Sequence, residues 1–238
     1  MTRTRPLVVV PTYNERDNLE RLIAELLNTP DLDVLVVDDQ SPDGTGNIAD
    51  TLAETSGGRV SVLHRRGARG LGLSYIDGLT RALATDATHI FQMDADFSHD
   101  PADIPRLLAR CADADLVIGS RYIPGGGIEN WPVRRVLLSG FANRYVRTIT
   151  GLQIKDCTSG FRCWSREALE RLPFQRVASD GYAFLVELLF EAASAGYRII
   201  EVPITFVERR EGVSKLSFRV VVESAVLPWR LGMAKNRR

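Results

Sequence analysis

Cysteine, lysine and long apolar runs are scarce in this sequence of 238 residues. Three cysteines, Cys111, Cys157 and Cys163, are too few for a disulfide-based scaffold in a chain of this length, which favours a reduced, cytosolic compartment. Cys157 and Cys163 also have no cysteine or histidine partners at metal-ligand spacing. No stretch approaches eighteen uncharged apolar residues, so we expect no membrane-spanning helix. The short apolar run near the N-terminus does not have the pattern of a signal peptide.

The formal net charge is zero, which gives the chain no general attraction to nucleic acid, and we expect no such partner. The two halves of the chain nevertheless differ. Residues 1–120 carry 11 Lys and Arg against 19 Asp and Glu, whereas residues 121–238 carry 19 against 11. An acidic half suits a cation site, and a basic half suits an anionic ligand or surface. Accidental composition is the alternative explanation.

Short β-branched runs alternate with helical patterns through the first half of the chain. We expect strands near residues 7–10, 34–37, 60–63, 89–93 and 116–118, with helices between them, and a late strand over residues 199–207. Continuous apolar strands alternating with helices are typical of a mostly parallel sheet covered on both faces, so the predicted fold class is α/β. Such sheets bind ligands beyond the carboxyl ends of their strands.

Pairs of acidic residues follow two of the expected strands. Asp38 and Asp39 end the second strand, and Asp94 and Asp96 follow the fourth. Carboxylates at Asp-x-Asp spacing can hold Mg²⁺ or Mn²⁺, which complete their coordination with water and substrate phosphate. Such a cation offsets the charge that develops on a departing diphosphate. A turn or a helix cap is the alternative explanation, but it accounts poorly for Asp39, which we expect to bond a nucleoside.

Motifs along nearly the whole chain carry a resemblance to a known family. Residues 11–15 (PTYNE), 37–45 (VDDQSPDGT), 92–99 (QMDADFSH) and 119–122 (GSRY) resemble the motifs of family 2 glycosyltransferases. Residues 156–162 (DCTSGFR), 180–182 (DGY) and 206–209 (FVER), with Gly212, Ser214 and Lys215, narrow this to the polyprenyl- and dolichyl-phosphate mannose synthases. The resemblance implies a GT-A catalytic domain over residues 1–210, followed by a basic, amphipathic helical segment over residues 211–238.

The resemblance also implies a reaction and a set of site residues. Mannose would pass, with inversion, from GDP-mannose to a polyprenyl phosphate. Asp94 and Asp96 would hold the metal, and Asp96, Arg121, Arg209 and Lys215 would be the catalytic residues. Arg121 and Arg135 would face the acceptor phosphate. The nucleotide sugar would lie against Pro11, Tyr13, Glu15, Val37, Asp39, Asp94, Ala95, Asp96, Arg121, Arg209 and Lys215.

A phosphate acceptor changes what the catalyst has to supply. A phosphate monoester is already an anion near neutral pH, so we expect no general base beyond the metal ligands. A hydroxyl acceptor needs such a base, and Asp180 is the candidate in that alternative. Two further alternatives are a polyprenyl-phosphate glucosyltransferase and a non-catalytic subunit of a membrane glycosylation complex.

Basic and large apolar residues are mixed in two late segments of the chain. Arg134, Arg135, Arg144 and Arg147 accompany Val136, Leu137, Leu138 and Phe141, and Trp229 has basic neighbours. This mixture is typical of a helix in a membrane interface, where a polyprenyl acceptor resides. We therefore expect a peripheral protein on the cytoplasmic membrane face, with a separate membrane-anchor protein as one candidate partner. A solvated helix face or core packing is the alternative.

Overall fold

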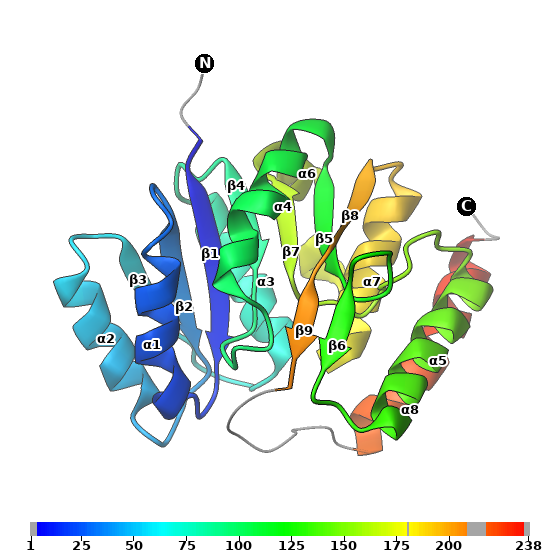
Figure 1. Cartoon of the computed structure of the whole chain (residues 1–238), viewed down its shortest axis with the longest axis horizontal. Coiled ribbons are helices and arrows are strands. Elements are labelled where there is room, and N and C mark those ends of the chain that lie inside the picture. Colours follow the sequence, from blue (N-terminus) through cyan, green and yellow to red (C-terminus); the bar gives the residue numbers. More distant parts are fainter. Residues whose placement is uncertain (1–3, 180, 209–217, 236–238) are drawn as a thin grey trace.

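The computed structural model describes residues 4–179, 181–208 and 218–235, and Figure 1 shows their arrangement. A seven-stranded sheet with the order β3-β2-β1-β4-β7-β5-β8 runs through the centre. The strands are β1 (Pro6–Thr12), β2 (Asp33–Asp38), β3 (Val60–His64), β4 (His89–Gln92), β5 (Leu116–Ser120), β7 (Arg162–Ser165) and β8 (Ile199–Pro203). Only β7 runs antiparallel to its neighbours in this described sheet.

Helices cover both faces of the sheet. The α-helices are α1 (Arg16–Leu26), α2 (Thr45–Thr55), α3 (Leu71–Leu83), α4 (Ile104–Arg110), α5 (Val133–Thr150), α6 (Arg166–Arg171), α7 (Gly181–Ser194) and α8 (Phe218–Lys235). Short 3₁₀ helices span Pro101–Asp103, Cys111–Asp113 and Phe174–Arg176. Core side chains of α1, α2 and α4 pack on one face, and those of α3, α6 and α7 on the other.

Strand β1 illustrates why this sequence forms a central strand. All seven of its residues are buried, and successive side chains enter the two opposite core clusters, Leu7 and Val9 on one side and Val8 and Val10 on the other. Such two-sided burial requires an apolar residue at almost every position, which is the pattern in the sequence. The predicted α/β class with a mostly parallel sheet is confirmed.

The expected strand over residues 199–207 is wrong in one respect, because it consists of two strands. Pro203 ends β8, and its ring nitrogen has no hydrogen to donate to a continuing ladder. After Ile204 the chain forms β9 (Thr205–Val207), which pairs in parallel with β6 (Gly127–Glu129) in a separate two-stranded sheet. This small sheet lies beside the carboxyl ends of the main strands and forms part of the site described below.

The C-terminal helix α8 packs against α5 and α7, and its Leu227 and Leu231 are buried in the core cluster of that face. The domain boundary expected near residue 210 lies outside the described residues. Among the helices that the structure describes, none combines the length and the apolar content needed to cross a membrane.

Candidate active site

A cleft of about 420 Å³ opens at the carboxyl ends of β1, β2, β4 and β5. It brings together most residues predicted for the site, namely Pro11, Tyr13, Glu15, Asp39, Asp94, Ala95, Asp96, Arg121 and Arg135. The predicted Arg209 and Lys215, and the alternative base Asp180, lie outside the described residues. Val37 differs from the expectation: its side chain is fully buried within the sheet and does not line the cleft.

Each of the two carboxylates after β4 accepts a hydrogen bond from the protein. The Tyr75 hydroxyl donates to Oδ1 of Asp94 at 3.1 Å, and the backbone N–H of Ser98 donates to Oδ1 of Asp96 at 3.1 Å. Phe97 between Asp96 and Ser98 has a left-handed φ of 58°, an uncommon conformation for a bulky residue. Such backbone strain is often found at ligand sites, where surrounding structure maintains it.

The donor set around Asp94 and Asp96 fits a hard divalent cation. Carboxylate oxygens are the ligands that Mg²⁺ and Mn²⁺ prefer, and one or two of them suffice when substrate phosphates complete the shell. A Cβ at Gly160 would lie 3.3 Å from Oδ2 of Asp94, so glycine keeps one side of this carboxylate open. The described residues contain no group of three or more His, Cys, Asp or Glu side chains that could hold a metal ion, so a cation at Asp94 and Asp96 would need water or substrate oxygens to complete its shell.

His99 contacts the backbone of the loop that carries Asp94 and Asp96. Its ring is buried, stacks on Phe161 with centroids 5.1 Å apart, and its Nδ1 accepts from the backbone N–H of Asp94 at 3.5 Å. Burial lowers the pKa of His99, which outweighs the opposite effect of Asp94 and Asp96. A neutral ring agrees with Nδ1 acting as an acceptor, so His99 is bonded to the backbone of the loop that carries Asp94 and Asp96.

The two acidic residues at the end of β2 have different environments. Asp38 is buried away from the cleft, where it accepts from the hydroxyl of Thr12 at 3.3 Å and the backbone N–H of Ser41 at 3.2 Å. Asp39 lines the cleft and accepts from the backbone N–H of Gly70 at 2.9 Å and from the buried guanidinium of Arg65. Sequence reasoning missed Arg65, although its place directly after a strand was a usable signal.

The outer wall near β1 consists of Tyr13 and Arg69. The guanidinium carbon of Arg69 lies 4.8 Å from the centre of the Tyr13 ring, and Arg69 also donates to the Tyr13 hydroxyl. Both residues line the cleft. An aromatic face with a neighbouring cation suits a flat, electron-rich ligand group such as a nucleobase.

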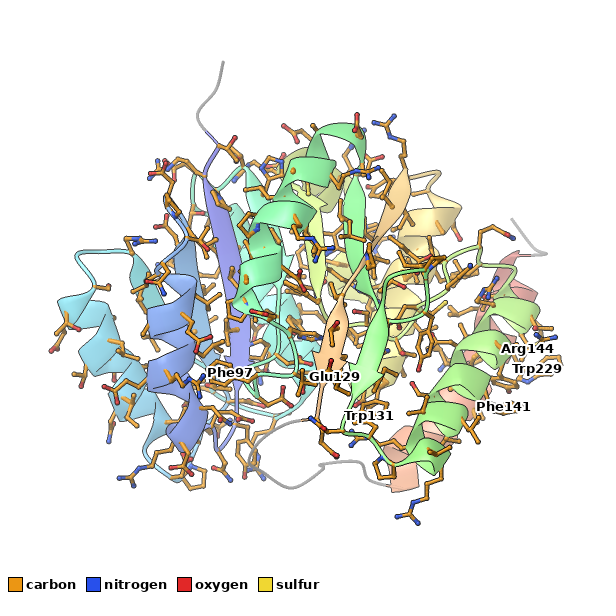
Figure 2. All side chains as sticks on the ribbon, viewed as in Figure 1. Phe97, Glu129, Trp131, Phe141, Arg144 and Trp229 are labelled. Atoms are coloured by element: carbon orange, nitrogen blue, oxygen red, sulfur yellow. The ribbon has the colours of Figure 1, made fainter. Side chains whose placement is uncertain are left out.

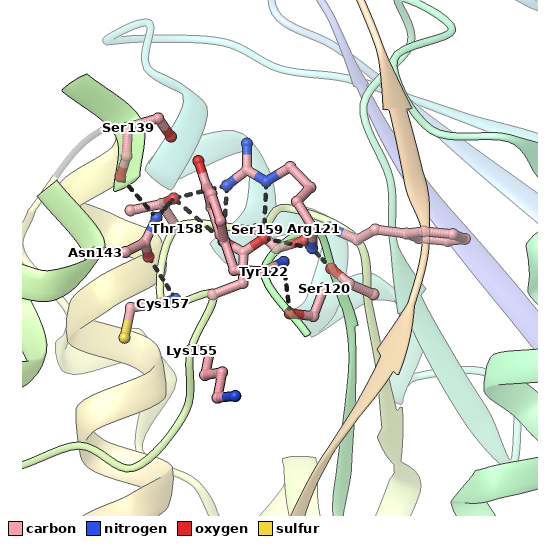
Figure 3. Close-up of polar contacts among 12 residues, drawn as sticks. Ser120, Arg121, Tyr122, Ser139, Asn143, Lys155, Cys157, Thr158 and Ser159 are labelled. Carbon is pink, nitrogen blue, oxygen red and sulfur yellow. Dashed lines mark hydrogen bonds and ion pairs between the residues drawn. The ribbon is translucent and has the colours of Figure 1, made fainter. Parts of the chain in front are cut away.

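Arg121, at the end of β5, is held by a fully buried carboxylate. Asp156 accepts from Nε and Nη2 of Arg121, both at 2.7 Å, and from its backbone N–H at 3.0 Å. Nη2 also donates to the Thr158 hydroxyl at 2.8 Å, a contact that Figure 3 shows. Burial alone lowers the pKa of Arg121, but the bonds and charge of Asp156 raise it overall. Arg121 therefore stays charged where it lines the cleft.

Arg135, near the start of α5, lies on the other side of an aromatic wall. Its guanidinium carbon is 3.9 Å from the centre of the Trp131 ring, and its Nη1 donates to Oε1 of Glu208 at 2.6 Å. Phe206 packs edge-on against Trp131 at 5.3 Å and lies 5.2 Å from the guanidinium carbon of Arg121. The sequence did not indicate either acidic partner, because Asp156 and Glu208 are remote in sequence from the arginines that they bind.

A mostly parallel sheet with a carboxylate pair and the buried Arg121 at its strand ends is the arrangement expected of a GT-A glycosyltransferase. Residues 7–173 match the model of the family "Glycosyl transferase family 2", so the chain belongs to this family and is a glycosyltransferase. The family resemblance predicted from the sequence is confirmed.

Two relatives with assigned names extend the likeness. The chain is 48% identical over 215 residues to the polyprenol monophosphomannose synthase of Mycolicibacterium smegmatis, covering 90% of this chain and 81% of that protein. It is 45% identical over 231 residues to the undecaprenyl-phosphate mannosyltransferase of Micrococcus luteus, covering 97% of this chain and 95% of that protein.

Solved structures share the fold at lower identity. One is the glucosyl-3-phosphoglycerate synthase of Mycobacterium tuberculosis with Mn²⁺, UDP-glucose and phosphoglyceric acid, with a TM-score of 0.62 and 21% identity, covering 96% of this chain and 80% of that one. Another is a mannosyltransferase of Pyrobaculum calidifontis with GDP-Man and Mn²⁺, with a TM-score of 0.57 and 20% identity, covering 98% of this chain and 74% of that one. Both comparisons support the GT-A fold.

Proposed function

We propose that this protein transfers mannose from GDP-mannose to a polyprenyl phosphate, with inversion, and yields polyprenyl-phosphate mannose and GDP. The observation that carries the proposal is one cleft lined by a carboxylate pair, Asp94 and Asp96, and by two arginines, Arg121 and Arg135. The names of the two relatives above support the mannosyl product and the lipid acceptor. The neighbour that holds GDP-Man and Mn²⁺ supports the donor and a divalent cation.

The chain's residues divide the work between the two substrates. Asp94 and Asp96 would hold Mg²⁺ or Mn²⁺, which supplies positive charge to the diphosphate leaving group when it is bound. Asp39 accepts hydrogen bonds from the nucleoside, and Tyr13 contributes an aromatic surface to the same part of the cleft. Arg121 and Arg135 orient the acceptor phosphate, whose oxygen forms the new bond to the anomeric carbon as the bond to the diphosphate breaks.

This division requires no general base, because the acceptor phosphate is ionised before it binds. Replacing Asp180 by asparagine tests this point, although Asp180 itself lies outside the described residues. We expect turnover of D180N to stay within an order of magnitude of the wild type. A loss of roughly a thousandfold or more, with GDP and metal binding intact, would favour the hydroxyl-acceptor alternative.

A transfer assay tests donor and product together. GDP-mannose, GDP-glucose and UDP-glucose, each radiolabelled in the sugar, are offered with polyprenyl phosphate and Mn²⁺. We expect label to enter an acid-labile lipid from GDP-mannose alone, and label from a glucose donor would favour the glucosyltransferase alternative. Calorimetry with GDP, with and without Mn²⁺, tests the non-catalytic alternative, which predicts absent or metal-independent binding.

We also propose that α5 and α8 contact the membrane surface that holds the acceptor. Leu137, Leu138 and Phe141 on α5 and Trp229 on α8 are exposed, and so are Arg144 on α5 and Arg230 on α8. Figure 2 shows Phe141, Arg144 and Trp229 at one edge of the molecule, away from the sheet. The Trp229 indole N–H donates to the Tyr145 hydroxyl at 2.8 Å, which ties the two helices together. Exposed apolar residues flanked by arginines suit an anionic bilayer surface.

Vesicle flotation tests the membrane proposal. We expect binding to vesicles that contain anionic lipid and a clear loss of binding when Leu137 and Phe141 are both replaced by serine. Leu73→Ser on α3 is the matched control, because Leu73 is also an exposed apolar residue but lies on another helix. Equal loss in the control, or no loss in the double variant, would contradict the proposal.

A further inference from the structure

We infer that Glu208 is a positioning residue that holds Arg135 ready for the acceptor phosphate. Oε1 of Glu208 accepts from Nη1 of Arg135 at 2.6 Å, and both side chains are about one-third exposed. Glu208 does not itself line the cleft, whereas Arg135 does. The inference rests on the proposed function, because it assigns Arg135 to the phosphate of the acceptor.

The geometry of this ion pair favours positioning over blocking. A guanidinium carries five N–H donors on one rigid plane, and a carboxylate that blocked the group would bind two parallel donors at once. Glu208 engages Nη1 alone, and the structure gives Nε and Nη2 of Arg135 no hydrogen-bond partner among the described residues. The pair therefore restrains the side chain and leaves a binding edge for phosphate oxygens.

The guanidinium is restrained from a second direction by Trp131. The guanidinium carbon lies 3.9 Å from the ring centre, so the group contacts the Trp131 ring while its Nη1 donates to Glu208. A long side chain normally loses much rotamer freedom when it binds a ligand. Because these two contacts restrict Arg135 beforehand, less of that entropy is lost when the phosphate binds.

Backbone hydrogen bonds join Glu208 to the small sheet, and its neighbour Val207 to the loop that carries Asp96. The backbone N–H of Glu208 donates to the carbonyl of Glu129 on β6 at 3.1 Å. One residue earlier, the N–H of Val207 donates to the carbonyl of Ser98, two residues beyond Asp96, at 3.2 Å. The end of β9 therefore connects the loop expected to bind the donor diphosphate with the arginine expected to bind the acceptor.

Variants at position 208 separate the contact from the charge. In E208A the contact is lost, and we expect the acceptor KM to rise about fivefold, as befits a partly exposed ion pair, with the GDP-mannose KM unchanged. In E208Q the amide oxygen can still accept from Arg135 while the negative charge is removed, so we expect an acceptor KM equal to or below that of the wild type. An acceptor KM that is unchanged or lower in E208A would overturn the inference.

Two comparisons make the test specific. E129Q is the matched control, because Glu129 is a neighbouring exposed acid for which the structure shows no side-chain contact with Arg135, and we expect it to behave as the wild type. We expect R135A to raise the acceptor KM about tenfold or more, and E208A to add nothing in the R135A background. Additive effects of the two substitutions would show that Glu208 does not act through Arg135.

A binding measurement distinguishes failure of this inference from failure of the proposed function. Calorimetry with geranyl phosphate, in the presence of GDP and Mn²⁺, reports the phosphate site without turnover. If the wild type binds this probe but transfers no mannose, the proposed reaction is wrong, and the E208A and E208Q affinities still decide the role of Glu208. If E208A binds the probe as tightly as the wild type, the positioning role is wrong, whatever the enzyme transfers.

Discussion

Replacement of Asp156 by asparagine removes a negative charge that is bonded to the buried guanidinium of Arg121. The Asp156 side chain is inaccessible to solvent, and it accepts from Nε, Nη2 and the backbone N–H of Arg121 at 2.7, 2.7 and 3.0 Å. Asparagine keeps one oxygen acceptor, but its amide NH₂ would face a guanidinium donor. Breaking a buried ion pair on one side typically costs about 3–5 kcal/mol, because the remaining charge is left uncompensated.

Thermal and urea unfolding of D156N measure this cost. For a chain of this size a loss of about 3–5 kcal/mol corresponds to a fall of roughly 6–20 °C in Tm. Asp77→Asn is the matched control, because Asp77 accepts from Nε of Arg65 at a similar 2.6 Å but is half-exposed, and Arg65 keeps its bond to Asp39. We expect the control to lose about 1 kcal/mol or less. Equal losses in the two variants would refute the argument that burial makes the Asp156 pair critical.

Two further predictions concern the metal site and alkaline pH. We expect Gly160→Ala to weaken Mn²⁺ binding in the presence of GDP by about tenfold, because the added Cβ would lie 3.3 Å from Oδ2 of Asp94. Gly140→Ala is the control, since a Cβ there meets open space, and calorimetry should show normal Mn²⁺ binding for it. Burial, followed by the charge of Asp156, raises the pKa of Cys157 to about 12, and burial also raises that of Cys163. Above pH ~8.5 an unfolded chain releases these protons and the folded chain keeps them, so the free energy of unfolding should fall as pH rises, by up to about 1.4 kcal/mol per pH unit and thiol. Equal urea midpoints at pH 8 and pH 10 would contradict this burial effect.

The sequence predicts the fold well where burial alone determines the pattern. A strand that is buried on both faces needs apolar residues at successive positions. Residues 7–10 and 34–37 have this pattern, and they lie in β1 and β2. The division of residues 199–207 was not predicted, because apolar character continues across it. A proline within an apparent strand argues against a continuous central strand, so Pro203 was the local signal for the break.

The site is predictable to the extent that chain position places side chains at strand ends. Asp39, Asp94 and Asp96 reach the cleft because their strands are parallel and end at one edge. Val37 does not, because its side chain belongs to a strand position that is buried on the covered face. The motif supplies Val37 as a family position, but core side chains cover both faces of β2, so Asp39, directly after the strand, reaches the cleft and Val37 does not.

The acidic partners could not be assigned from sequence for a different reason. Asp156 lies 35 residues beyond Arg121, and Glu208 lies 73 residues beyond Arg135, so tertiary structure alone pairs them. Any of the chain's 30 acidic residues could have been chosen by charge complementarity alone. Local hydrogen bonds, by contrast, could be foreseen, such as the Ser98 N–H donating to Asp96 two residues away.

These pairings also give a reason for arginine instead of lysine at positions 121 and 135. A guanidinium can bond a carboxylate along one edge and still offer another edge to a ligand, because its five donors are fixed in one plane. Arg121 uses Nε and Nη2 for Asp156, and Arg135 uses Nη1 for Glu208. An ammonium has three donors on one freely rotating atom, so it has no fixed edge to divide between a carboxylate and a phosphate. Arginine can therefore be held in place by the protein before the phosphate binds.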